Sequence, residues 1–260
     1  MLNSFIKRFR SDYKTLNLIE ISRANLLHNY KYLSSLKRNI RVAPVLKSNG
    51  YGHGLIEVAK ILDPLGAPFF CVDSLYEAYE LYKANIKTSI LIMGFTDPQN
   101  FKVKKLPFSV AVFDFETAKI LNIHQPGCKI HIFVDTGMHR EGIPLKELPS
   151  FLKGIKQLPN LKIEGLMSHL ASSDNPKDPL NKMQIRNFKK SMEIYRKLGV
   201  NPKWIHLSNS AGLLNNIPAN LQNLSRIGLA LYGLTNEKRN SKNKFLKPVL
   251  TFKSRIIQIK

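Results

Sequence analysis

One lysine ends an otherwise apolar run near the N-terminus. The segment from Pro44 to Gly54 reads PVLKSNGYGHG, so Lys47 closes the run and three glycines follow at alternate positions. A lysine amine, once deprotonated, can form a Schiff base with an aldehyde. The glycines permit a bend that would bring Tyr51 close to whatever Lys47 holds. A lysine at a strand end can also be merely solvated, so the rest of the chain must decide.

Polar residues and glycines also follow later apolar runs. They are His139 and Arg140 in DTGMHREG, His169 in MSHLASSD, Asn209 and Ser210 in HLSNSAG, and Arg226, Gly228 and Leu229 in SRIGLALYG. Each has a structural alternative: Asp135 could cap a loop, and NSAG could form only a helix N-cap. Their joint occurrence after successive runs favours a shared site.

The chemistry of this set fits an aldehyde and a phosphate carried on one flat ring. Backbone N–H groups near Ser210 and Gly228 can bind a phosphate, because a helix N-terminus and a missing side chain allow close approach. A histidine can lie against the ring, and two arginines can pair with its polar atoms. We therefore predict pyridoxal 5′-phosphate as the cofactor, held by Lys47, and no metal site.

Short apolar runs alternate with amphipathic helical segments along the chain. Helical segments at 74–84 and 183–199 are typical of this alternation, which indicates parallel βαβ units. The sequence therefore predicts an α/β fold, a (β/α)₈ barrel of the TIM type. The eight predicted strands are 41–47, 68–72, 89–93, 109–113, 129–134, 162–167, 204–208 and 224–227.

A barrel places its chemistry at the C-terminal ends of its strands, often with a phosphate site after strands seven and eight. Lys47 ends the first predicted strand, and Arg226 ends the eighth. A doubly wound sheet is the alternative, but GYGHG lacks the GxGxxG spacing of its binding turn. The barrel is therefore favoured.

Three parts of the chain are expected. Residues 1–16 form an N-terminal extension, 17–235 the cofactor-binding barrel, and 236–260 a linker with the first strand of a truncated C-terminal β domain. A strand and a helix precede the barrel, with Ser22 as the N-cap of that helix. The tail, KPVLTFKSRIIQIK, is typical of a strand without a turn or a partner.

Composition narrows the class of protein. The 260 residues carry a formal net charge of +22, which is compatible with nucleic-acid binding. The basic residues are scattered and no nucleic-acid-binding motif accompanies them, so we predict no nucleic-acid partner. No apolar run reaches the length of a membrane span, and no secretory signal is visible. With only two cysteines, Cys71 and Cys128, a cytoplasmic protein is expected.

The motifs resemble those of the bacterial alanine racemases, which are barrel-type pyridoxal-phosphate enzymes. PVLKSNGYGHG is similar to their cofactor-lysine segment, and VDTGMHREG to their arginine-bearing loop. MSHLASSD, HLSNSAG and SRIGLALYG resemble later site segments in the same order, and IEISRANLLHNYKYL resembles their opening. The resemblance extends from about Asn17 to the end of the chain.

The resemblance implies a role for each site residue. Lys47 would bind the cofactor and act as the base on the D-alanine face, Arg140 would contact the phenolic oxygen and the substrate carboxylate, and Arg226 would meet the ring nitrogen. His169 would lie against the ring. The other implied cofactor-binding residues are Tyr51, Asn209, Ser210, Gly228 and Leu229.

Three departures from the family pattern bear on activity. Phe133 stands where the family often has a modified lysine that supports the arginine, and Ile227 replaces a usual proline. The third concerns the second base, a tyrosine that the family's C-terminal domain contributes from a partner subunit; no residue here matches it. We therefore expect the chain alone to bind the cofactor and to racemise alanine poorly, and the homodimer implied by the family is doubtful here.

Four functions remain open at this level, in the following order. The first is an alanine racemase that supplies D-alanine for peptidoglycan, from a truncated, split or incomplete gene product. The second is a one-domain, non-enzymatic pyridoxal-phosphate carrier. An inactive remnant comes third, and a nucleic-acid-binding protein, which rests on charge alone, comes last.

Overall fold

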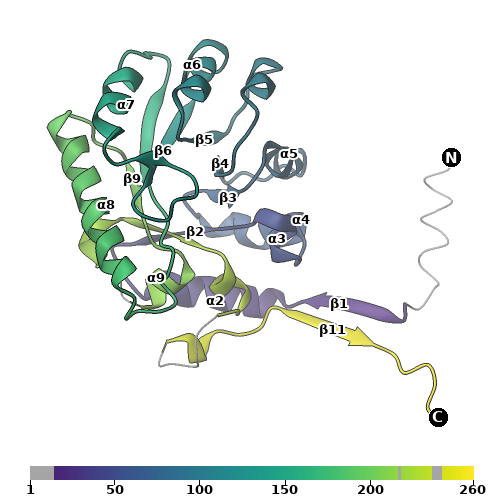
Figure 1. Cartoon of the computed structure of the whole chain (residues 1–260). Coiled ribbons are helices and arrows are strands. Elements are labelled where there is room, and N and C mark those ends of the chain that lie inside the picture. The colour runs from purple at the N-terminus through teal and green to yellow at the C-terminus, as the bar shows by residue number, and fades with distance from the viewer. Residues whose placement is uncertain (1–14, 216–217, 236–241) are drawn as a thin grey trace.

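Eight parallel strands form a nearly closed barrel (Figure 1). The computed structural model describes residues 15–215, 218–235 and 242–260, so the expected extension and linker lie largely outside the described residues. Around the barrel the order is β2-β10-β9-β8-β6-β5-β4-β3. A bridge between Val45 and Cys71 links β2 to β3, where the Leu46 N–H donates to the Cys71 carbonyl at 2.8 Å.

All eight predicted strands are confirmed; five are shorter than predicted, two have the predicted bounds and β6 is one residue longer. They are β2 (Arg41–Pro44), β3 (Phe70–Val72), β4 (Ile90–Ile92), β5 (Ser109–Val112), β6 (Lys129–Asp135), β8 (Lys162–Met167), β9 (Trp204–His206) and β10 (Leu224–Ile227). A further short strand, β7 (Ile143–Pro144), pairs with the end of β6. The fold is therefore the predicted (β/α)₈ barrel.

Helices cover the outside of the barrel. The longest, α8 (Pro179–Lys197), begins before the predicted residue 183, because Asp178 caps it and Pro179 suits the first turn. The others on the outside are α2 (Arg23–Ser35), α4 (Leu55–Leu62), α5 (Leu75–Lys83), α6 (Phe115–His124) and α7 (Leu148–Ile155). Two short segments, α3 (Lys47–Tyr51) and α9 (Ser210–Leu214), follow β2 and β9 at the C-terminal ends of the strands. Short 3₁₀ turns are Asp63–Leu65, Pro98–Lys102, Ala219–Leu221, Leu229–Tyr232 and Asn243–Phe245.

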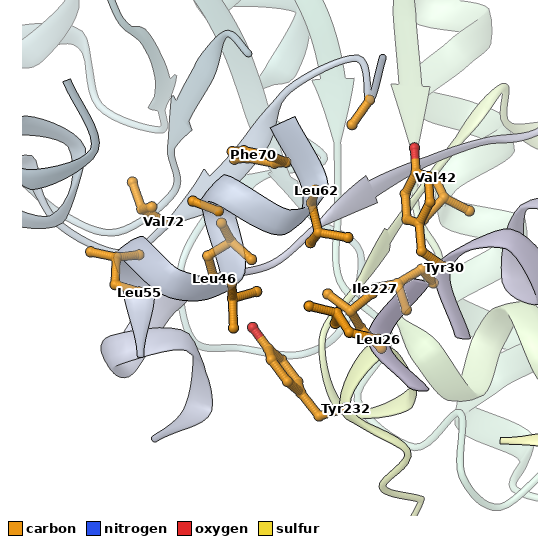
Figure 2. Close-up of a cluster of buried hydrophobic side chains, with 14 of the residues drawn as sticks. Leu26, Tyr30, Val42, Leu46, Leu55, Leu62, Phe70, Val72, Ile227 and Tyr232 are labelled. Carbon is orange, nitrogen blue, oxygen red and sulfur yellow. The ribbon is translucent and has the colours of Figure 1, made fainter. Parts of the chain in front are cut away.

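The main core lies between the strands and this helical layer. Leu26 and Leu33 of α2 belong to one buried cluster with Val42 and Ile227 of the barrel. Figure 2 shows Leu26, Val42 and Ile227 in this cluster. Ser22 caps α2 as predicted, since its hydroxyl accepts from the Asn25 N–H at 3.2 Å. The burial of this face stabilises the pairing of β2 with β10, the first and last strands of the barrel in the sequence.

Strand alternation sends a second set of side chains into the barrel. In β6, Ile130 and Ile132 pack outward in the helical layer, so His131 and Phe133 face inward. In β10, Arg226 is likewise inward while Ile227 is outward. The barrel interior therefore holds polar as well as apolar residues.

The tail has a partner that the sequence did not predict. Strand β11 (Leu250–Ser254) pairs antiparallel with β1 (Asn17–Ile21), and the two form a separate ribbon beside the barrel (Figure 1). The expectation of a strand is correct, but the expectation that it lacks a partner is wrong. The two segments lie at opposite ends of the sequence, where no local pattern reports their pairing.

Candidate functional site

A cavity of about 520 Å³ opens at the C-terminal ends of the strands. All of the cofactor-binding and substrate-binding residues expected from the sequence line it: Lys47, Tyr51, Arg140, His169, Asn209, Ser210, Arg226, Gly228 and Leu229. His139, which shares a loop with Arg140, points elsewhere: its side chain is 82% exposed and lies 3.3 Å from the Asp135 carboxylate. The predicted residues thus share one cavity, and His139 lies outside it.

The backbone after Lys47 follows a left-handed turn, which explains the glycines of this segment. Ser48 and Asn49 both have φ of 55°, Gly50 has 62° and Tyr51 has 53°. Non-glycine residues pay roughly 1–2 kcal/mol for this conformation, with asparagine the most tolerant. The Asn49 side chain also accepts a hydrogen bond from the Leu55 N–H at 2.9 Å, which joins the turn to α4.

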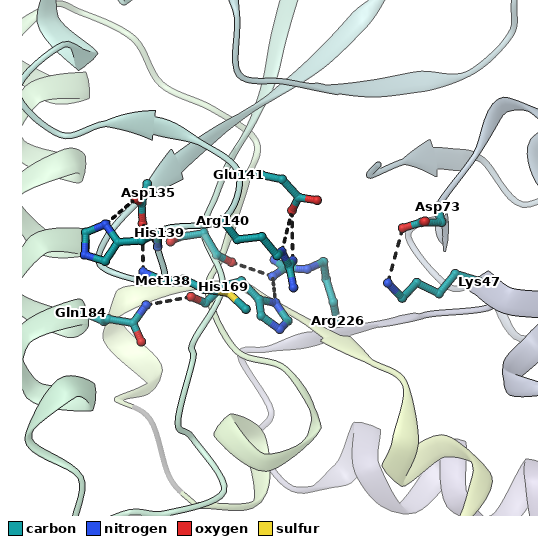
Figure 3. Close-up of polar contacts among 11 residues, drawn as sticks. Lys47, Asp73, Asp135, Met138, His139, Arg140, Glu141, His169, Gln184 and Arg226 are labelled. Carbon is teal, nitrogen blue, oxygen red and sulfur yellow. Dashed lines mark hydrogen bonds and ion pairs between the residues drawn. The ribbon is translucent and has the colours of Figure 1, made fainter. Parts of the chain in front are cut away.

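Lys47 meets a carboxylate from the neighbouring strand. Its Nζ lies 3.4 Å from Asp73 Oδ1, just beyond the end of β3. Figure 3 shows this pair on one side of the site, with Arg226, His169 and Arg140 on the other. The amine therefore faces the cavity from the segment that follows β2, opposite the two arginines.

Tyr51 and Gly228 lie against each other at the edge of the cavity. A Cβ atom on Gly228 would collide with the Tyr51 hydroxyl, so glycine is required there for the tyrosine to keep its place. The Tyr51 ring packs at 5.3 Å from the Tyr232 ring, which limits its movement. Burial raises the pKa of Tyr51, and so keeps its hydroxyl protonated and able to donate.

Ser210 and Asn209 combine a structural contact with a place in the cavity wall. The Asn209 side chain accepts from the Gly212 N–H at 2.9 Å, so the N-cap interpretation of NSAG is confirmed. The Ser210 hydroxyl accepts from the Ala230 N–H at 3.2 Å and so joins the loops that follow β9 and β10. These two loops form the polar side of the cavity that the barrel fold predicts.

Arg226 is the most buried cation of the site, with only 3% of its surface exposed. Its guanidinium donates to the Ser168 carbonyl at 2.6 Å, to His169 Nδ1 at 3.1 Å and to His206 Nδ1 at 2.7 Å. Burial lowers the pKa of Arg226 to about 10, so it remains charged at neutral pH. Because its partners hold it on several sides, Arg226 is a fixed donor in the cavity wall.

His169 is neutral for the same physical reason. Burial first, and then the nearby charges of Arg226, Arg140 and Lys47, lower the pKa of His169 to about 3. The ring therefore offers a flat, uncharged face to the cavity at neutral pH.

Arg140 has a carboxylate partner from its own loop. Its Nε and one terminal nitrogen each lie 3.0 Å from Glu141 Oε2 (Figure 3). Phe133, at the position where support for the arginine was in question, is buried and packs with Met167 in the barrel interior. Asp135 accepts from the N–H groups of residues 137–139 and fixes the start of the loop. The support of Arg140 thus comes from Glu141, an exposed pair of modest strength.

Several polar residues in and below the site were not predicted from the sequence. Three of them, His206, His131 and Glu164, lie inside the barrel, and Asp73 and Glu141 lie at its rim. Strand alternation could have revealed His131, since KIHIFV places it on the opposite face from Ile130 and Ile132. The partners of these residues come from other strands, and a single sequence does not pair them.

Among the described residues, no helix has the length and apolar character needed to cross a membrane.

Residues 21–236 match the family model described as alanine racemase, N-terminal domain. The chain is 35% identical over 251 residues to an alanine racemase of Syntrophobacter fumaroxidans, covering 93% of this chain and 66% of that protein. An alanine racemase of Fusobacterium nucleatum is 35% identical over 246 residues, which is 93% of this chain and 67% of that one.

Solved structures give the same result. An alanine racemase of Clostridium difficile 630 in complex with cycloserine superposes with a TM-score of 0.88 at 27% identity, covering 96% of this chain and 70% of that chain. The alanine racemase of Bacillus anthracis with bound L-Ala-P gives a TM-score of 0.82 at 30% identity, over 92% of this chain and 64% of that one. The chain thus spans about two thirds of the length of the relatives it matches.

Proposed function

Because the chain belongs to the alanine racemase family, we propose that it is the pyridoxal-phosphate-binding barrel of an enzyme that interconverts L-alanine and D-alanine. The observation that carries this proposal is one cavity shared by the amine of Lys47 and the buried guanidinium of Arg226. Few ligands need a reactive amine at one wall and a fixed, donor-only cation at the other.

The residues of the cavity fit the cofactor. The hydroxyls of Tyr51 and Ser210 and the backbone of Gly228 and Leu229 form a polar corner that suits a phosphate. The missing Cβ of Gly228 leaves room there for the Tyr51 hydroxyl. Lys47 would bind the aldehyde, and His169 would lie against the ring. Asn209, which caps the turn beside Ser210, would hold that corner in place.

Arg226 would set the electronic character of the site. A guanidinium can only donate hydrogen bonds, so a ring nitrogen facing it stays unprotonated. Pyridoxal phosphate, when bound, supplies an electron sink that acidifies the Cα–H bond of an amino acid. With a weakened sink, we expect the proton to return quickly to Cα, which favours racemisation over transamination.

Lys47 and Arg140 would act on the substrate. Arg140 would orient alanine through its carboxylate, and its contact with Glu141 keeps the guanidinium at the edge of the cavity. Lys47 Nζ would remove and return the Cα proton on the face that is presented to β2. Asp73, 3.4 Å from this amine, would hold it in position between the two transfers.

Racemisation also needs a proton carrier on the other face of Cα. In the family this is a tyrosine of the C-terminal domain, contributed by a partner subunit. We therefore propose a homodimer for the whole enzyme, with residues 17–235 as the barrel and 236–260 as a linker and the start of the second domain. We propose further that the enzyme supplies D-alanine for peptidoglycan and is cytoplasmic. The two free cysteines, Cys71 and Cys128, support the cytoplasmic location.

The function can be tested by adding pyridoxal phosphate to the purified protein and recording its visible absorption band, followed by a chiral assay for D-alanine formed from L-alanine. We expect a band that disappears in Lys47→Ala, and racemisation by the 260-residue chain well below that of a full-length relative. Equal racemisation by the two proteins would contradict the role assigned to the second domain. A band without any racemisation, even after the relative's C-terminal domain is supplied, would favour the carrier alternative.

A further inference from the structure

An unbroken series of polar contacts runs from Arg226 through the barrel interior to its opposite end. Arg226 contacts His206 Nδ1 at 2.7 Å, and His206 Nε2 contacts His131 Nδ1 at 2.8 Å. His131 Nε2 then lies 3.4 Å from Glu164 Oε2. Glu164 is near the start of β8, so the series extends from the site to the N-terminal end of the strands.

The two ends of this series dictate where every proton lies. A guanidinium can only donate, so His206 Nδ1 must accept, and a neutral His206 then carries its proton on Nε2. That proton is donated to His131 Nδ1, so His131 also carries its own proton on Nε2. A carboxylate can only accept, which completes the series at Glu164. No other arrangement of two neutral rings satisfies all of the contacts.

Burial agrees with neutral rings. His131 and His206 are both 0% exposed, and burial lowers the pKa of each below its ordinary value. Burial alone would raise the pKa of Glu164, but hydrogen bonds from His131 and Lys129 outweigh it and lower that pKa to about 2. Glu164 is therefore ionised, and Lys129 Nζ, 3.1 Å away, faces its other oxygen.

The absence of a side chain at Gly165 leaves room for the His131 ring. A Cβ atom on Gly165 would collide with the His131 ring, so glycine at that position is what lets the ring lie between β6 and β8. The register of these two strands also shifts between Ile130 and His131. Both features indicate that the place of His131 is built into the barrel.

We propose that Glu164 is a positioning residue for Arg226, acting through His131 and His206, whose Nε2-protonated rings form one directed hydrogen-bond chain between a partly buried carboxylate and a buried guanidinium. The chain holds the guanidinium at a fixed place and supplies a partial countercharge from a distance. Its consequence for the cofactor rests on the proposed function, whereas the protonation pattern of the two rings does not.

The experiment is ¹⁵N NMR of histidine-labelled protein without cofactor, with the seven histidines assigned by single substitutions. In the wild type we expect both His131 and His206 as the neutral Nε2–H form, unchanged between about pH 6 and 9. A proton on Nδ1 of either ring, or a charged ring at neutral pH, would overturn the proposal.

Variants separate positioning from a merely structural role. Glu164→Ala removes the terminal acceptor, so the two rings can reverse their protonation once Arg226 moves away from His206 Nδ1. We therefore expect mixed protonation at His206, together with about five- to tenfold weaker binding of pyridoxal phosphate. Glu164→Gln keeps an acceptor oxygen and should retain the pattern. Glu193→Ala, at an exposed position of α8, is the control and should change neither. An unchanged His206 in a folded Glu164→Ala protein would contradict the proposal, even if no cofactor bound to any variant.

Discussion

At the residue scale, the site depends on an amine, a buried guanidinium and hydroxyl groups that line the same cavity. Lys47 follows β2, and Arg226 lies on the neighbouring strand β10, yet the Lys47 side chain is partly exposed and Arg226 is buried. The types and order of the site residues were predictable from the sequence, because each lies at or after the end of a recognisable apolar run. The contacts that fix them, such as Glu141 with Arg140, were not, because side-chain partners depend on loop geometry.

Removal of the Tyr51 hydroxyl should weaken phosphate binding selectively. Tyr51→Phe keeps the ring packed on Tyr232 but loses one donor at the polar corner. We expect affinity for pyridoxal phosphate to fall about tenfold, and affinity for pyridoxal, which has no phosphate, to stay unchanged. Titration by absorbance measures both, and Tyr82→Phe, at an exposed position of α5, is the matched control. An equal loss for both ligands would assign Tyr51 to another part of the cofactor.

Addition of a methyl group at Gly228 tests the same corner from the other side. Gly228→Ala would push against the Tyr51 hydroxyl, whose ring has little room to retreat. The expected result is a larger loss of pyridoxal-phosphate affinity than in Tyr51→Phe, with the far-UV circular dichroism spectrum unchanged. Wild-type affinity in this variant would mean that Tyr51 and Gly228 do not share a ligand.

At the scale of elements, strands were predicted well and their partners less well. The eight barrel strands are short and rich in Ile, Val and Phe, and such runs are recognisable without knowledge of the fold. The start of α8 was missed because its first turn is polar, although Asp178 and Pro179 mark it. The pairing of β1 with β11 was missed because it joins distant segments.

The left-handed turn after Lys47 gives a prediction at this scale. Asn49→Ala places a less tolerant residue at φ of 55° and removes the acceptor for the Leu55 N–H. We expect a loss of about 1–2 kcal/mol in the free energy of unfolding, measured by urea denaturation. Asn49→Gly should lose less, since glycine adopts this conformation freely. Asn201→Ala, at an exposed position before β9, serves as the control.

At the scale of the whole molecule, burial of histidines makes stability depend on pH. His131, His169 and His206 all have a pKa below the ordinary value because they are buried. The unfolded chain therefore takes up protons below about pH 6.5 that the folded chain does not. The contribution of these neutral histidines to the free energy of unfolding should be fully present above about pH 6.5 and should decrease as the pH falls. For His169 the decrease should continue down to about pH 3, the pKa in the folded chain.

Urea denaturation at pH 7.5 and pH 5.0 measures this effect. Each histidine that must stay neutral contributes roughly 1.4 kcal/mol per pH unit below its unfolded pKa. His206→Gln should flatten the dependence, although it will lower stability at both values of pH. A protein that is equally stable at pH 5.0 and 7.5 would argue against neutral buried rings.

The central claim is that Lys47 holds the aldehyde of pyridoxal phosphate within the barrel. The most direct test is to mix the protein with pyridoxal phosphate, reduce the product with borohydride and locate the modified lysine by peptide mass spectrometry. We predict one modification, on Lys47, at a stoichiometry near one per chain. Modification spread over surface lysines, or none on Lys47, would contradict it.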